Sequence, residues 1–235
     1  MSHAKLVIFR HGQTEYNRQH LVTGHRDVPL NATGEAQARE IGGILKDEYF
    51  HAVYSSTLGR AFNTAALALD QTAVNHHLKG DGGAWQIIAD KSIIEKDAGE
   101  FAGRCHRTDP EIQAFDRAYD KKTPGGESPC DVVERVQRFY RDEILPRLER
   151  GENVLVVCHA GIVRAFRAFL DTELPEHGND PDHFKKRVPN ATPTVYEYKN
   201  GSLMRMYQIE NPKEVAANEN KQPAAPKPPK SGNAA

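Results

Sequence analysis

Cysteine is scarce in this sequence of 235 residues, which has only Cys105, Cys130 and Cys158. An odd and sparse set of cysteines cannot form a disulfide framework, so the sequence predicts free thiols in a reducing compartment. Cys158 lies within an apolar run, where a thiol is expected to act as a small buried hydrophobic group.

Long apolar runs and a strong charge of one sign are also missing. No apolar run approaches the roughly 20 residues that a membrane-spanning helix needs, and no signal-peptide-like segment precedes the first expected strand. We therefore expect a cytoplasmic protein. The net charge of -1 gives no overall attraction to nucleic acid or to anionic lipid, so neither is expected as a partner.

The residues that are present describe a globular domain followed by a tail. Hydrophobic residues make up 38% and charged residues 27% of the chain, which is typical of a folded domain with a sizeable core. We expect one domain over residues 1–210. Residues 211–235 are rich in Pro, Ala and Lys, cannot bury a core, and are predicted to be disordered.

Short apolar runs alternate with amphipathic helical patterns along the domain. The predicted strands are 6–9, 51–56, 85–89 and 154–158, and a C-terminal hairpin pairs 194–198 with 202–209. The predicted helices are 35–46 with Thr33 as N-cap, 57–69 with Ser56 as N-cap, 110–119, a long helix after Ser128 that Pro146 interrupts, and 162–170. Strand–helix alternation of this kind predicts an α/β fold, a three-layer, doubly wound and mostly parallel sheet that the hairpin closes.

Polar residues follow the three strongest strands at the point where each one stops. Arg10-His11-Gly12 ends the first strand, Arg60 lies in the first turn of the helix after the second, and His159 follows the run 154–158. The carboxyl ends of parallel strands share one edge of a sheet, where ligands bind. Taken singly, each motif also fits a solvated surface turn or an exposed arginine. Together, and with Glu95 after another apolar pair, they predict one site.

These residue types suit phosphoryl transfer. Arginine is planar, always charged and forked, so Arg10 and Arg60 can clamp phosphoryl oxygens. A neutral histidine is available at physiological pH, which makes His11 the candidate nucleophile. His159 can add an N–H donor or a positive charge, and Glu95 can protonate the leaving oxygen and then activate water. No His/Cys/Asp spacing suggests a metal, and the adjacent pair His76-His77 cannot easily face one ion.

The order of these motifs resembles that of the histidine phosphatase superfamily, the phosphoglycerate mutase-like proteins. The similarity rests on Arg10-His11-Gly12, Ser55 to Arg60, Glu95-Lys-Asp-Ala-Gly99, Pro124-Gly-Gly-Glu-Ser128, His159-Ala-Gly-Ile-Val-Arg164 and Thr194-Val-Tyr-Glu197. The resemblance implies a phosphohistidine at His11 and catalytic roles for Arg10, Arg60, Glu95 and His159. It also implies substrate-binding roles for Asn17, Thr23, Gly24, Arg104 and Gly161.

The resemblance leaves the reaction open between three classes. Hydrolysis of a small phosphorylated metabolite, without a cofactor, is favoured, because the family's mutases carry a long segment with paired arginines after the catalytic Glu. Here Lys96 to Pro124 is short and has no such pair, and His25 departs from the usual Trp of the mutases.

A mutase that uses 2,3-bisphosphoglycerate is the alternative, because Arg104 and Arg107 can still reach a second phosphate and residues 171–188 can act as a cover. A non-catalytic phospho-ligand-binding protein ranks far below both. The oligomeric state is open, with a homodimer as one option.

Overall fold

A computed structural model describes residues 2–116, 119–174 and 187–209. The described residues form a mixed sheet of six strands in the order β3-β2-β4-β1-β5-β6. The strands are β1 (His3–Arg10), β2 (Ala52–Ser56), β3 (Ile88–Asp90), β4 (Val154–Cys158), β5 (Thr194–Lys199) and β6 (Ser202–Gln208). Strands β1 to β4 run parallel, β5 is antiparallel to β1, and β6 is antiparallel to β5. The predicted α/β class is confirmed.

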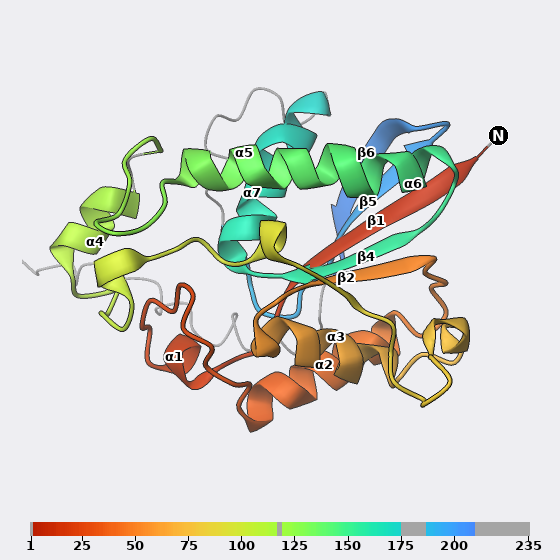
Figure 1. Ribbon diagram of the computed structural model, residues 1–235, viewed down its shortest axis with the longest axis horizontal. Helices are drawn as coiled ribbons and strands as arrows, with labels where there is room; N and C mark the ends of the chain where they lie inside the picture. Colours follow the sequence, from red (N-terminus) through yellow and green to blue (C-terminus); the bar gives the residue numbers. More distant parts are fainter. Residues whose placement is uncertain (1, 117–118, 175–186, 210–235) are drawn as a thin grey trace, which may run out of the picture.

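Helices cover both faces of this sheet (Figure 1). They are α1 (Glu15–Arg18), α2 (Ala32–Ile44), α3 (Gly59–Leu69), α4 (Pro110–Asp116), α5 (Pro129–Phe139), α6 (Leu145–Glu149) and α7 (Ala160–Leu170). In Figure 1, α2 and α3 lie on one side of the sheet, and α5, α6 and α7 lie on the other. Among these helices, none is both long and apolar enough to cross a membrane within the described ranges.

The central strands are apolar on both faces because each face has its own core. Ile8 and Val156 pack into the core beneath α5 and α7, whereas their neighbours Phe9 and Val157 pack into the core beneath α2 and α3. Successive side chains of a strand point to opposite faces. Strand β4 is therefore buried at each of its five positions, as its continuous apolar run predicts.

The register of the central strands brings the predicted motifs to one edge. Arg10 pairs with Cys158 across β1 and β4, and the amide of His11 donates to the carbonyl of Cys158 at 3.0 Å. The residues that follow, His11 and His159, are consequently neighbours in space, although 148 positions separate them in the sequence.

Three predicted boundaries were wrong by a few residues. Helix α2 is capped by Asn31, whose side chain accepts from the amide of Gly34, and not by Thr33. Helix α3 begins at Gly59, and its N-cap residue is Leu58, which makes no side-chain capping hydrogen bond. Ser56, the predicted N-cap, lies in the preceding turn, where its hydroxyl accepts from the Leu58 amide. The edge strand is β3 and not 85–89, since the Trp85 indole donates to Asp70 and stands outside the strand.

The long helix after Ser128 is interrupted, as predicted, and the structure shows the form of the interruption. Ser128 and Asp131 form a capping box at the start of α5. The α-helix then widens into a π-helical stretch over Tyr140–Ile144, and α6 continues with Pro146 in its first turn. Proline has no N–H and clashes with the carbonyl four residues earlier, so the wider turn accommodates it.

The other expectations concern segment ends. Helix α7 begins at Ala160, two residues before its predicted start, and the hairpin β5–β6 is confirmed with Asn200 and Gly201 at φ of 49° and 79°. The last residues of the predicted helix 110–119, most of the suggested cover 171–188, and the tail 211–235 lie outside the described residues.

Candidate active site

His11 lies just beyond the end of β1 and is 3% exposed. Its Nδ1 atom is 2.7 Å from the carbonyl oxygen of Gly12. A carbonyl oxygen only accepts, so Nδ1 carries the hydrogen of the neutral ring and Nε2 keeps its lone pair. Burial, helped by the charges of Arg10 and Arg60, lowers the pKa of His11 well below its usual value. The ring is therefore neutral at physiological pH, with the Nε2 lone pair available.

Gly12 lets two loops approach closely around His11. A Cβ atom at Gly12 would lie 2.3 Å from the carbonyl oxygen of Gly34, a distance at which the backbone must move. The Gly12 amide donates to the hydroxyl of Thr64 on α3 at 3.1 Å. The turn after β1 is thus fixed between α2 and α3.

The guanidinium groups of a buried arginine, Arg60, and of a half-buried one, Arg10, lie near the imidazole of His11. Arg60 in α3 donates to the carbonyl of Gly24 at 2.9 Å and to that of Arg26 at 2.6 Å, while Arg10 donates to the carbonyl of Val188 at 3.1 Å. The Nε atom of each is buried without a partner among the described residues. Burial lowers the pKa of Arg10 to about 10, so it stays charged at neutral pH. Two cations, each with a buried and unpartnered donor among the described residues, make an anion site.

His159 precedes α7 and is fully buried. Its ring centroid lies 5.1 Å from that of His11, with the two planes at 63°. Both of its ring nitrogens lack a hydrogen-bond partner within the part of the chain that the structure describes. Burial, followed by the charge of Arg60, lowers the pKa of His159 well below its usual value. An unpartnered buried imidazole at this position suits contact with a bound ligand.

Glu95 approaches these groups from the loop that follows the 3₁₀ turn Lys91–Ile93. Its Oε1 atom accepts from the amide of Lys96 at 2.8 Å and from the amide of Gly161 at 3.1 Å. A Cβ atom at position 161 would lie 2.4 Å from Oε1, so the carboxylate can rest on this amide only because residue 161 is glycine. The Gly161 amide lies farther from Oε2, at 3.5 Å, so Oε2 is the more weakly held oxygen and the one better placed to exchange a proton.

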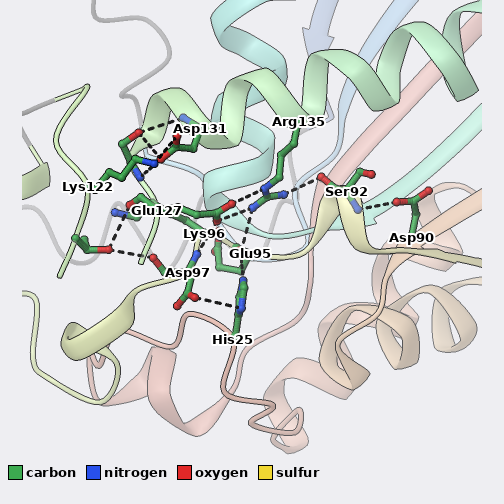
Figure 2. Close-up of polar contacts among 12 residues, drawn as sticks. His25, Asp90, Ser92, Glu95, Lys96, Asp97, Lys122, Glu127, Asp131 and Arg135 are labelled. Atoms are coloured by element: carbon green, nitrogen blue, oxygen red, sulfur yellow. Dashed lines mark hydrogen bonds and ion pairs between the residues drawn. The ribbon is translucent and has the colours of Figure 1, made fainter. Parts of the chain in front are cut away.

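The main chain of Glu95 is held from two further directions (Figure 2). His25 Nε2 lies 2.8 Å from the Glu95 carbonyl oxygen, and Arg135 donates to the same oxygen at 3.2 Å. Arg135 also forms a two-pronged ion pair with Glu127. Although burial opposes it, this hydrogen-bonded pair lowers the pKa of Glu127. Sequence reasoning did not identify His25, Arg135 or Glu127 as part of the site.

The predicted substrate-binding residues divide into two groups. Asn17 and Gly24 lie close to the central residues of the site. Asn17 accepts a hydrogen bond from Asn190, which also donates to the carbonyl of His11. The carbonyl of Gly24 accepts from Arg60. Thr23 precedes Gly24, and Gly161 holds Glu95. Arg104 is engaged elsewhere, because Asp109 and Glu111 each lie 2.7 Å from its guanidinium.

Asn190 is the residue of the site that sequence reasoning missed most completely. Its Nδ2 donates to the carbonyl of His11 at 2.8 Å and to Asn17 Oδ1 at 3.3 Å. The next residue, Ala191, has a positive φ of 47° and donates its amide to the carbonyl of Arg10. The only sequence signal is an Asn between two prolines just before β5, the neighbour of β1.

Comparisons with known proteins agree with this arrangement. The family model of the histidine phosphatase superfamily (branch 1) matches residues 6–208. A 2,3-bisphosphoglycerate-dependent phosphoglycerate mutase of Azorhizobium caulinodans is 34% identical over 199 residues, 81% of this chain and 90% of the relative. The enzyme of the same name from Methylobacterium sp. (strain 4-46) is 38% identical over 174 residues, 71% of this chain and 80% of the relative.

Solved structures give a second group of relatives. The mycobacterial glucosyl-3-phosphoglycerate phosphatase complexed with VO3 superposes with a TM-score of 0.65 at 26% identity, covering 87% of this chain and 96% of that one. A protein from Thermus thermophilus superposes with a TM-score of 0.62 at 27% identity, covering 86% and 98%. The span that the family model matches holds the two histidines, both arginines and Glu95, and this chain belongs to the histidine phosphatase superfamily.

Proposed function

We propose that the protein hydrolyses small phosphate monoesters through a phosphohistidine at His11. The observation that carries this proposal is the tautomer of His11. Its Nδ1–H is held by the Gly12 carbonyl, so Nε2 has its lone pair available beside the guanidinium groups of Arg10 and Arg60. A phosphoryl group needs a positioned nucleophile and positive charge around its equatorial oxygens, and little other chemistry.

The first step forms a bond between His11 Nε2 and phosphorus and breaks the bond between phosphorus and the ester oxygen. The electron pair of the broken bond stays on the leaving oxygen, which takes a proton from Glu95. Arg10 and Arg60 neutralise the charge on the three equatorial oxygens, and the neutral imidazole of His159 donates a hydrogen bond to one of them. The covalent intermediate divides one difficult displacement into two easier ones.

The second step reverses these roles. Glu95, now a carboxylate, takes a proton from water as the water oxygen attacks phosphorus. The bond between phosphorus and nitrogen breaks, its electron pair returns to His11 Nε2, and inorganic phosphate leaves. The amides of Lys96 and Gly161 hold one oxygen of Glu95, so the same carboxyl group stays in place for both steps.

Hydrolysis is favoured over mutase turnover by the surroundings of Arg104. A mutase must retain a doubly phosphorylated intermediate, which calls for extra positive charge near the site. The sequence offers Arg104 for that charge, but Asp109 and Glu111 already neutralise its guanidinium. Lys122, further along the same segment, pairs with Asp131 at 3.1 Å. Phosphatases among the structural relatives also support hydrolysis.

The second candidate is a phosphoglycerate mutase that uses 2,3-bisphosphoglycerate. The observation in its favour is the name of the curated relatives, which are 34% and 38% identical to this chain. Both reactions use the same phosphohistidine, so the residues described above serve either of them. What separates them is whether water or a second hydroxyl group accepts the phosphoryl group.

Phosphorus NMR of the enzyme with 3-phosphoglycerate, with and without 2,3-bisphosphoglycerate, tests the proposal in one tube. We expect inorganic phosphate to form faster than 2-phosphoglycerate, or other small monoesters to be hydrolysed faster than 3-phosphoglycerate is isomerised. Isomerisation that is faster than every hydrolysis, and that 2,3-bisphosphoglycerate stimulates, would establish the mutase instead.

A further inference from the structure

The peptide unit between Glu95 and Lys96 is hydrogen-bonded on both of its sides (Figure 2). On one side its carbonyl oxygen accepts from His25 at 2.8 Å and from Arg135 at 3.2 Å. On the other side its N–H, which belongs to Lys96, donates to the Glu95 carboxylate at 2.8 Å. A peptide unit is planar and trans, so its C=O and N–H point in opposite directions. Hydrogen bonds that fix the position of the Glu95 carbonyl oxygen therefore also fix the direction of the Lys96 N–H.

The two donors come from different parts of the fold. Arg135 reaches the oxygen from α5, and it is half-buried and held by Glu127 and by the carbonyl of Ser92 at 2.7 Å. His25 reaches it from the loop after α1, and its side chain is 39% exposed. Figure 2 shows the Glu95 main chain between them. Since a carbonyl oxygen only accepts, the neutral ring of His25 must carry its hydrogen on Nε2.

We propose that His25 is a positioning residue for Glu95, acting through the Glu95–Lys96 peptide. Its hydrogen bond holds the peptide plane so that the Lys96 N–H points at Oε1 of the carboxyl group. Hydrogen bonds at the two ends of one amide also strengthen each other, because each polarises the group that the other uses. This inference rests on the proposed role of Glu95 as the acid and base of the reaction.

The backbone on either side of His25 holds Arg60 through the carbonyls of Gly24 and Arg26, but the imidazole of His25 points to Glu95 and not to the groups that bind the phosphoryl oxygens. Its described contacts are the Glu95 carbonyl and, at 3.7 Å from Nδ1, the carboxylate of Asp97. Loss of the His25 donor should consequently disturb proton transfer to the leaving oxygen and leave phosphate binding intact. This separation gives the proposal its test.

The variants are His25→Phe, which keeps an aromatic ring and removes the donor, and His25→Gln, whose amide restores an N–H. His76→Phe is the matched control, because His76 is exposed and lies on a distant 3₁₀ turn against Trp85. Each is assayed with an alkyl phosphate, whose leaving oxygen needs a proton, and with 4-nitrophenyl phosphate, whose leaving group departs without one. Inhibition by vanadate reports the phosphoryl site.

We expect His25→Phe to lower kcat/KM on the alkyl phosphate by on the order of 10–100-fold, and on the nitrophenyl ester by less than about 3-fold, because small misplacements of a catalytic group are costly. His25→Gln should recover most of the loss, and vanadate inhibition should stay unchanged in both. Equal losses on the two esters, no loss in His25→Phe, or no recovery in His25→Gln would overturn the proposal.

Glu95→Gln, assayed in parallel, separates this proposal from the proposed function. A Glu95→Gln enzyme that loses both esters equally would overturn the acid role of Glu95 itself. Hydrogen exchange of the Lys96 amide, followed by NMR, tests the positioning without any turnover. We expect faster exchange in His25→Phe than in the wild type, and an unchanged rate would overturn the role of His25 even where Glu95 behaves as proposed.

Discussion

The imidazole rings of His11 and His159 lie 5.1 Å apart, edge to face, at the ends of two adjacent parallel strands. Only one of the two has its tautomer fixed by a protein group, since the Gly12 carbonyl binds His11 Nδ1 whereas neither nitrogen of His159 has a partner among the described residues. The two histidines are therefore not equivalent. In the proposed mechanism, His11 attacks the phosphoryl group and His159 binds it.

This asymmetry predicts the outcome of labelling. Brief incubation with a labelled phosphoester should give a phosphoenzyme that acid destroys and base preserves. We expect His11→Ala to abolish it, because the imidazole with a directed lone pair is then gone. His159→Ala should only slow its formation, by roughly 10²–10³-fold, as for loss of one transition-state donor. Rapid quench followed by gel autoradiography measures both, and labelling that persists in His11→Ala would contradict the assignment of the nucleophile.

The buried histidines should make stability depend on pH. Burial lowers the pKa of His11 and of His159 below the ordinary value near 6.5, so below that pH the unfolded chain binds protons that the native chain does not. The free energy of unfolding is then highest above about pH 6.5. It falls as the pH drops from there toward the lowered pKa values of the native state, by about 1.4 kcal/mol per pH unit for each histidine.

Urea unfolding of the ligand-free protein between pH 8 and pH 5 measures this slope. His159→Asn should remove roughly half of the contribution from these two histidines, because His11 is the one buried histidine that then remains in the described part of the chain. A slope that His159→Asn leaves unchanged would show that other groups carry the pH dependence.

Gly161 should tolerate no side chain if Glu95 is to keep its position. In Gly161→Ala the new Cβ would lie 2.4 Å from Glu95 Oε1, so the carboxyl group must move away from its amide donors. We expect a fall in kcat on alkyl phosphates of on the order of 10²-fold, with a smaller effect on 4-nitrophenyl phosphate. Gly43→Ala is a suitable control, since a Cβ at position 43 meets nothing within 4 Å. Full activity in Gly161→Ala would mean that Glu95 works from another position.

Asn190 should act on the phosphoryl site through Asn17. The backbone N–H of Thr14 and the side-chain Nδ2 of Asn190 both donate to Asn17 Oδ1. These two donors fix the orientation of the Asn17 side chain, whose NH₂ group points away from them. We expect Asn190→Ala to weaken vanadate binding and to lower kcat/KM on all monoesters alike. In the Asn17→Ala background the same substitution should cost much less, and a double-mutant cycle measures that difference. Strictly additive losses would show that the two residues act independently.

Local sequence patterns were enough for the fold class, and they indicated which residues would gather at one edge of the sheet. Four polar residues come after apolar runs that stop abruptly, namely Arg10, His11, Arg60 and His159. Because the carboxyl ends of parallel strands lie at the same edge of a sheet, residues that follow those strands lie at that edge. The capping box at Ser128 and the interruption near Pro146 were also predictable, because both depend on residues within one turn of each other.

Contacts between distant segments are what the tertiary structure alone decided. The pairing of Asn190 with the carbonyl of His11 joins positions 179 apart, and the hydrogen bond from His25 to the carbonyl of Glu95 joins positions 70 apart. Neither pairing leaves a periodic pattern in the sequence, because each joins a side chain to a main-chain carbonyl that any residue could supply. The sequence therefore determines which groups can perform the chemistry, and the packing of loops around the sheet edge determines how those groups are held.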